Sequence, residues 1–206
     1  LIEGKHHDQV IVIGAHYDHM GIRDGYIWNG ADDNASGTVG AMTLAKALAA
    51  TGTRPDKTLI IALWSSEELG LLGSEYFVKN PVIPLKNIRL NLNFDMISRY
   101  ITEDNKRGVD MTYTASYPGF RDITEANLKK YGIDLEVYYH PSDDPPGGSD
   151  HRSFVKAGIP VMRFKPGHRE EYHTPADETE TVDQDIFEKI IRISFLNIWE
   201  LANSEW

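Results

Sequence analysis

Cysteine is absent from this chain of 206 residues. Disulfide bonds and thiolate metal sites are therefore excluded, and any bound metal must be held by His, Asp or Glu. No apolar run approaches the length of a membrane span, and no segment resembles a signal peptide. Positive charge is scarce, because 21 Lys and Arg stand against 31 Asp and Glu, for a formal net charge of -10. That balance argues against nucleic acid or an anionic membrane as a partner, since both require a basic surface.

Internal repeats and low-complexity tracts are lacking as well. The length predicts one domain over residues 1–206, and 41% hydrophobic with 25% charged residues is typical of a globular protein. The chain opens on Leu1-Ile2-Glu3-Gly4, which is strand-like and has no initiator Met. We therefore expect a processed or trimmed catalytic piece, from which any export signal would be missing.

Predicted strands and helices alternate along the chain. Apolar or alternating runs predict strands over residues 10–15, 59–64, 88–94, 108–114, 135–139 and 159–164. Residues 33–50 are predicted to be a loop followed by an Ala-rich helix. Further helices are predicted over residues 70–79, 122–130, 150–156 and 183–202, and Ser149 is expected to be the N-cap of the short helix at residues 150–156. This order predicts an α/β fold, a three-layer sandwich whose central sheet is mainly parallel and flanked by helices.

Two adjacent carboxylates, Glu67 and Glu68, follow the apolar run that ends at Trp64. They stand where a buried parallel strand opens into a loop, the place where ligands collect in open α/β sheets. Neighbouring anions repel each other unless a cation is present. In isolation, however, an acidic pair of this kind is more commonly the start of a helix, where the helix dipole favours negative charge.

Further potential ligands also follow predicted strands or lie in adjoining loops: His16, Asp18, Asp33, Asp95 and His173. In a parallel sheet those strand ends converge on one crevice. Imidazoles and carboxylates without sulfur suit zinc or a similar divalent ion. Five to six such groups exceed one tetrahedral shell, so we expect a two-metal site with a bridging carboxylate.

Five motifs carry a resemblance to a known family. They are His16-Tyr17-Asp18, the segment Gly30-Ala31-Asp32-Asp33-Asn34-Ala35-Ser36-Gly37, Ser66-Glu67-Glu68-Leu69-Gly70, Asn93-Phe94-Asp95 and His173-Thr174-Pro175-Ala176-Asp177. In this order, and together with residues 148–154 and 158–160, they resemble the co-catalytic zinc aminopeptidases. That family includes bacterial leucyl aminopeptidases, glutamate carboxypeptidase II and the glutaminyl cyclases. The similarity covers nearly the whole chain.

The resemblance implies two zinc ions, although cobalt or manganese fits the same ligand types. It implies His16 and Asp95 on one ion, and Glu68 and His173 on the other. Asp33 is expected to bridge both, because it stands three residues before Ser36-Gly37 as the family's bridging aspartate does, and Asp32 is the alternative. A cis peptide bond is expected between Asp33 and Asn34.

The resemblance also implies the catalytic groups. Glu67 is expected to accept a proton from a water that bridges the two metal ions, and to return it to the leaving amine. Asp18 is expected to hydrogen-bond the far nitrogen of His16 and to fix its tautomer. Tyr172 is a candidate for stabilising the transition state, unless its loop turns the ring toward the core.

Several polar residues have ordinary structural explanations. Asp150 and His151 are at least as well explained by helix capping and core support as by substrate contact. Asp177 either steadies the loop of His173 or caps a turn. The remaining histidines read as ordinary surface residues: His6, His7, His140 and His168.

The leading functional hypothesis is a metallo-aminopeptidase that acts on peptides. A carboxypeptidase would need Arg or Lys arranged around a terminal carboxylate; Arg152 and Arg163 are candidates, but the sequence does not group them. A glutaminyl cyclase, an acyltransferase that uses one zinc, is disfavoured by the complete ligand set. A metal-free binding domain on the same fold is disfavoured because no ligand is missing. Oligomeric state is open, and a secreted or periplasmic location is expected from the resemblance alone.

Overall fold

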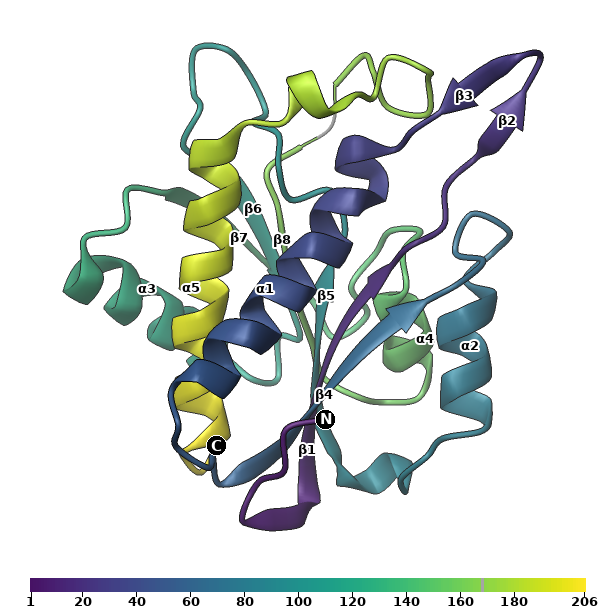
Figure 1. The fold of residues 1–206 in the computed structure, drawn as a ribbon. Coiled ribbons are helices and arrows are strands. Elements are labelled where there is room, and N and C mark those ends of the chain that lie inside the picture. The colour runs from purple at the N-terminus through teal and green to yellow at the C-terminus, as the bar shows by residue number, and fades with distance from the viewer. Residues whose placement is uncertain (168) are drawn as a thin grey trace.

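A computed structural model gives the fold of residues 1–167 and 169–206 (Figure 1). The strands are β1 (His6–His16), β2 (Gly21–Arg23), β3 (Tyr26–Trp28), β4 (Lys57–Trp64), β5 (Ile88–Phe94), β6 (Gly108–Tyr113), β7 (Glu136–Pro141) and β8 (Val161–Lys165). The α-helices are α1 (Gly37–Ala50), α2 (Leu72–Lys79), α3 (Gly119–Tyr131), α4 (His151–Lys156) and α5 (Gln184–Ala202). A single helical segment over Ala31–Ser36, kinked at Asp33 and Asn34, leads directly into α1.

Six strands form the central sheet, in the order β4-β1-β5-β8-β6-β7. All neighbouring pairs are parallel except β6 and β8, which are antiparallel. Helices α1, α3 and α5 cover one face, and α2 and α4 cover the other (Figure 1). The predicted three-layer sandwich with a mainly parallel mixed sheet is therefore confirmed.

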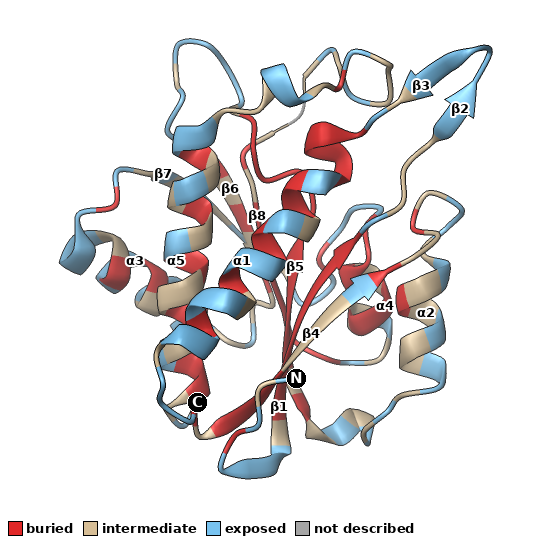
Figure 2. Ribbon diagram, viewed as in Figure 1, coloured by how far each residue is buried: buried red, intermediate tan, exposed pale blue. Residues whose placement is uncertain are grey.

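Two apolar clusters fill the spaces between the layers. The larger one packs β1, β5 and β8 against α1 and α5, and includes Ile13, Leu92, Phe164 and Ile190, each with none of its surface exposed. The smaller one lies beneath α2 and α4 around Trp64 and Phe154. Figure 2 shows the buried strands β1, β5 and β8 running through the middle of the molecule. Burial on both faces explains why these strands read as nearly continuous apolar runs.

The parallel arrangement fixes where polar residues gather. Strand β1 lies between β4 and β5, and all three run in the same direction. His16, the last residue of β1, therefore lies at the same edge of the sheet as residues 65–68, which follow β4, and Asp95, which follows β5, as predicted from the sequence.

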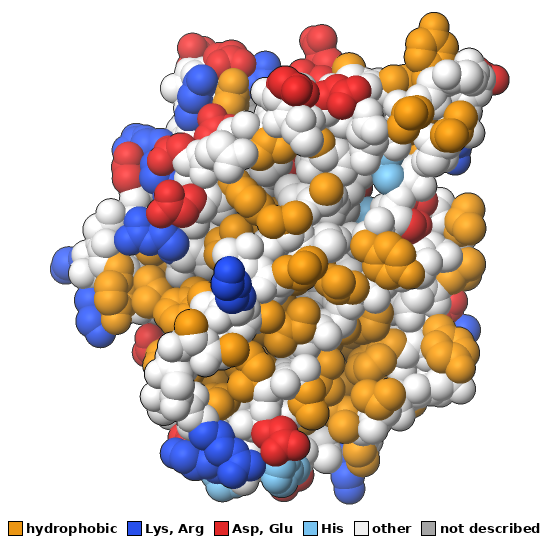
Figure 3. All heavy atoms as spheres, viewed as in Figure 1, with side chains coloured by type: hydrophobic (Ala, Val, Ile, Leu, Met, Phe, Trp, Pro, Cys, Tyr) orange, Lys and Arg blue, Asp and Glu red, His pale blue; other side chains and the backbone are white. Residues whose placement is uncertain are grey.

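Three details differ from the sequence prediction or extend it. Residues 21–28 form a two-stranded hairpin that projects from the body, with Ile22 75% exposed and Ile27 61% exposed (Figures 1 and 3). The N-cap of α4 is Asp150, not Ser149. The Ser149 hydroxyl is used instead as the acceptor for the side-chain amide of Asn93, at 2.8 Å.

Histidines predicted to lie on the surface do so where the structure describes them. His6, His7 and His140 are exposed, and His168 lies outside the described residues. None of the described helices has the length and apolar composition that crossing a membrane requires.

Candidate metal centre

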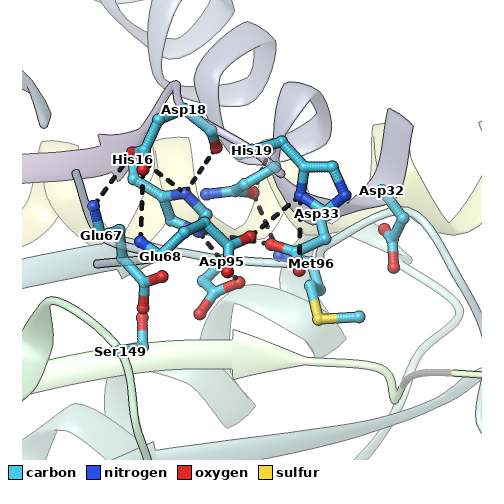
Figure 4. Close-up of polar contacts among 12 residues, drawn as sticks. His16, Asp18, His19, Asp32, Asp33, Glu67, Glu68, Asp95, Met96 and Ser149 are labelled. Atoms are coloured by element: carbon cyan, nitrogen blue, oxygen red, sulfur yellow. Dashed lines mark hydrogen bonds and ion pairs between the residues drawn. The ribbon is translucent and has the colours of Figure 1, made fainter. Parts of the chain in front are cut away.

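Asp33 lies between two histidines that are far apart in the sequence. Its Oδ1 is 3.4 Å from Nε2 of His16, at the end of β1, and its Oδ2 is 3.1 Å from Nε2 of His173, in the loop before α5. The neighbouring Asp32 points elsewhere, because its Oδ1 accepts hydrogen bonds from the backbone and hydroxyl of Ser98. Of the two aspartates considered from the sequence, the structure therefore brings Asp33 to both histidines, and Figure 4 shows Asp33 beside His16 with Asp32 turned away.

Each histidine has a second carboxylate partner. Nε2 of His16 is 3.7 Å from Oδ1 of Asp95, and Nε2 of His173 is 3.3 Å from Oε2 of Glu68. The resulting arrangement has Asp33 in the middle and one His–carboxylate pair on either side. This is the pairing that the resemblance implies. The peptide bond between Asp33 and Asn34 is cis, as expected.

Two triplets of side chains bring their ligand atoms within 4.8 Å of one another: His16 with Glu67 and Asp95, and His19 with Asp33 and Glu68. Both triplets offer nitrogen and oxygen but no sulfur, which is the ligand chemistry of zinc and related divalent ions. Glu67, which the resemblance implies as a base, therefore also stands close enough to His16 and Asp95 to be a metal ligand.

His19 is a part of the centre that the sequence motifs did not single out. Its Nδ1–H donates to Oε1 of Glu68 at 2.9 Å, and its Nε2 is buried with no partner among the described residues. A Cβ on Gly30 would lie 2.5 Å from the His19 ring, so a glycine is required there. The only sequence signal was the position of His19, three residues after His16 in the same strand-end loop.

Electrostatics favour positive charge at this place. Burial alone would lower the pKa of His16, but contacts with Asp33 and Asp95 raise it to about 11. Burial would raise the pKa of Asp95, and the hydrogen bond with His16 instead holds it well below its ordinary value. The carboxylates are thus arranged to attract a cation, and the donor set present fits a metal ion.

Glu67 has a different environment from Glu68. Burial raises the pKa of Glu67 to about 8, with the nearby carboxylates adding to the shift. Burial also acts to raise the pKa of Glu68, but the hydrogen bond from His19 and the charge of His173 lower it. The pKa is therefore raised for Glu67 and lowered for Glu68, although the two residues are adjacent in one loop.

The prediction for Asp18 needs a correction. Its carboxylate was expected to hydrogen-bond His16, but Oδ1 lies 3.8 Å from His16 Nδ1, and the closer acceptor is the backbone carbonyl of Asp18, at 3.2 Å. The carboxylate oxygens accept instead from the backbone N–H groups of Glu67 and Glu68, at 3.0 and 3.2 Å (Figure 4). The backbone N–H groups of Glu67 and Glu68 are adjacent, so each one donates to a different oxygen of the same carboxylate. Asp18 therefore fixes the loop of Glu67 to the end of β1.

Asp177 holds the other side of the centre in the same way. Its two carboxylate oxygens accept from the backbone N–H groups of Asp32 and Asp33, at 2.9 and 3.0 Å, and its side chain is buried. The sequence left open whether Asp177 steadies the loop of His173 or caps a turn, and these hydrogen bonds join the loop of His173 to the backbone at Asp32 and Asp33, which favours the first possibility.

We expect Asp177→Asn to lower the free energy of unfolding by about 1–3 kcal/mol, because an amide replaces one acceptor by a donor that faces a buried N–H. The metal content is expected to fall too, since Asp33 loses its anchor. Urea unfolding and metal analysis measure both quantities. Asp104→Asn, at an exposed position with no hydrogen bond among the described residues, is the control. Equal stability of the two variants would contradict the supporting role.

The centre opens into a cavity of about 430 Å³. Its walls include the ligand-type residues together with Tyr172, Ser149, Arg163 and Lys165. The Tyr172 ring stacks on His173 with centroids 3.8 Å apart, so it faces the cavity and not the core. Asp150 and His151 are fully buried and are not part of the wall.

A protein-family model matches residues 1–197, and its description is peptidase family M28. The chain belongs to this family. Leucine aminopeptidase 2 of Trichophyton rubrum is 33% identical over 161 residues, which are 77% of this chain and 31% of that protein. The chain therefore spans about a third of the length of this relative.

Solved structures resemble the fold of the chain over nearly its whole length. A zinc aminopeptidase from Bacillus subtilis superposes with a TM-score of 0.76 at 24% identity, covering 96% of this chain and 47% of the other. A glutaminyl cyclase from Bacteroides thetaiotaomicron superposes with a TM-score of 0.68 at 19% identity, covering 94% of this chain and 74% of the other. Since a peptidase and a cyclase share the fold, the fold alone does not identify the reaction.

Proposed function

We propose that this M28 chain is a zinc-dependent aminopeptidase that binds two zinc ions. The observation that carries the proposal is the position of Asp33 between two histidines, each with its own additional carboxylate. His16 and Asp95 would hold one ion, Glu68 and His173 the other, and Asp33 both. When bound, zinc would polarise the scissile carbonyl and make water a better nucleophile.

The proton chemistry falls to Glu67. Its carboxylate lies beside the His16–Asp95 pair in the wall of the cavity, and its backbone is fixed by Asp18. In this position Glu67 takes the proton from the attacking water and passes it to the leaving amine. Tyr172, which lines the same cavity, would donate a hydrogen bond from its hydroxyl to the developing oxyanion, and burial raises its pKa to about 12. A tyrosine with that pKa remains a donor at neutral pH.

The assignment is tested by two measurements on one preparation. We expect about two zinc ions per chain after reconstitution, together with release of the chromophore from aminoacyl anilides. One zinc with formation of pyroglutamate from N-terminal glutamine would support the cyclase alternative. No bound metal would support a non-catalytic domain. The two separate ligand triplets favour the first outcome.

Export from the cell is a further part of the proposal and rests on the resemblance alone. Fractionation of cells that produce the full protein tests it, and recovery only from the cytoplasm would contradict it.

A further inference from the structure

Two cationic side chains share the cavity with the carboxylate-rich centre. Arg163 and Lys165 are two residues apart on β8 and both line its wall. Side chains alternate along a strand, so these two project to one face while Met162 and Phe164 enter the core on the other. The cavity is therefore anionic on the side of the candidate metal centre and cationic along β8.

Arg163 is buried, and no ion pair joins it to any residue that the structure describes. Only 7% of its surface is exposed, and among the described residues no carboxylate lies within 4.0 Å of its guanidinium nitrogens. Two other shielded arginines are paired: Arg99 lies 3.2 Å from Glu171, and Arg152 lies 2.6 Å from Asp144. A buried cation without a paired anion is costly, so an anion is expected to occupy the space in front of Arg163.

One polar contact of Arg163 is internal. Its Nη1 donates to Nδ1 of His151 at 3.4 Å, and the His151 Nε2–H donates to the carbonyl of Pro146 at 3.1 Å. This chain of contacts supports the loop over residues 146–149 that forms another wall of the cavity. It uses one of the five guanidinium N–H groups and leaves the rest available to a ligand.

Support of the loop does not account for Lys165. This side chain lines the same cavity and forms no hydrogen bond or ion pair with the described residues. Both cations act on Asp95 at longer range and help to lower its pKa, but among the described residues its ion-pair partner within 4.0 Å is His16. Two cations side by side in a cavity of about 430 Å³, large enough for one or two amino-acid residues, suit a carboxylate group.

We propose that Arg163 and Lys165 form a carboxylate-binding subsite, which selects peptides that carry a carboxylate next to the scissile bond. This inference rests on the proposed peptidase function. The carboxylate has two possible sources: the side chain of an N-terminal Glu or Asp, or the free C-terminus of a dipeptide. Both present the same planar anion to the guanidinium and ammonium groups.

Matched substrates distinguish the two sources. Glutamyl and glutaminyl anilides differ only in the side-chain charge and have no free carboxyl terminus, whereas leucyl-leucine and its amide differ only in the terminal charge. With the zinc-loaded protein, we expect the charged member of one pair to be hydrolysed with a kcat/KM about 10 to 100 times that of its neutral partner, the range typical of a hydrogen bond to a charged group.

Variants test the residues. Lys165→Met is expected to reduce the ratio of kcat/KM between the charged and the neutral substrate toward one. Arg163→Lys is expected to reduce it in part, because it keeps the positive charge but loses the pair of N–H groups that binds both oxygens of a carboxylate. Lys129→Met, at an exposed position on α3, is the matched control and is expected to keep the ratio of the unmodified protein.

Binding is measured separately from turnover. If the side chain is the source, calorimetry of the zinc-loaded protein is expected to give tighter binding of L-glutamate than of L-glutamine, and Lys165→Met is expected to weaken the binding of glutamate about tenfold or more. If leucyl anilide is hydrolysed but neither substrate pair shows a preference and glutamate binds no better than glutamine, the subsite is wrong and the peptidase stands. If no substrate is hydrolysed, the peptidase is wrong, and the subsite is decided by binding alone, of glutamate against glutamine and of leucyl-leucine against its amide.

Discussion

Glu67→Gln is expected to keep both zinc ions yet to lower kcat by about 10²–10⁴, the usual contribution of a positioned general base. Glutamine has nearly the same shape, so the loop fixed by Asp18 is retained, but an amide accepts no proton at neutral pH. Glu68→Gln is expected to give the opposite pattern. Its carboxylate lies 3.3 Å from Nε2 of His173 and accepts from His19, so its loss lowers the zinc content first.

The comparison separates two roles for adjacent carboxylates. Zinc content and kcat are measured for both variants, with Glu75→Gln, on the exposed side of α2, as the control for a loss of one negative charge. Glu67 also falls within ligand distance of His16 and Asp95. If Glu67→Gln loses about one zinc ion per chain, Glu67 is a ligand and the proposed base is wrong.

The fold could be predicted from the sequence because its main elements have strong local signals. Strands β1, β4 and β5 are short apolar or alternating runs, and the predicted limits of α1, α3 and α5 lie within a few residues of those observed. The antiparallel pairing of β6 with β8 had no comparable signal, since strand direction is set by how the chain crosses the sheet and not by periodicity. The hairpin at residues 21–28 was missed because its exposed strands are only three residues long each.

The site could be predicted for a different reason. The candidate ligands come at or after the ends of strands that were predicted to be parallel. Because the carboxyl ends of parallel strands lie at one edge of the sheet, these side chains were expected to lie close together. The roles of Asp18 and Asp177 could not be derived this way, because a carboxylate that accepts from two successive backbone N–H groups depends on the local path of another loop. His19 was likewise invisible as a partner of Glu68, since the contact joins residues 49 positions apart.

The grouping of Arg163 with Lys165 on β8 could not be derived from the sequence either. Arg152 and Arg163 were both candidates for binding a carboxylate, but the sequence did not group them with each other or with a further cation. Arg152 pairs with Asp144, whereas Lys165 shares the cavity wall with Arg163. The grouping depends on which face of the strand is turned to the cavity, and therefore on the position of β8 between β5 and β6.

Removal of metal is expected to loosen the centre and to lower the melting temperature substantially. Four shielded carboxylates line one cavity: Asp33, Glu67, Glu68 and Asp95. Without a cation they repel each other, and the loss of their hydration lowers the free energy of unfolding. Zinc at 100 times its dissociation constant stabilises the folded state by about 2.7 kcal/mol for each site, or roughly 5–10 °C for a chain of this size.

Thermal unfolding of the chelator-treated protein, with zinc added back in steps, measures this rise. Asp33→Asn is expected to lose most of it, because a neutral amide in the bridging position weakens both sites at once. Glu188→Gln, on the exposed face of α5, removes the same charge far from the cavity and is expected to retain the full rise. A zinc-dependent rise that survived in Asp33→Asn would mean that the stabilising ions bind elsewhere, and identical melting of the metal-free and zinc-loaded protein would remove the metal from the proposal. Hydrogen exchange locates the effect: protection should fall at residues 31–36 and 65–71, the loops that Asp177 and Asp18 anchor, before it falls in the strands of the central sheet.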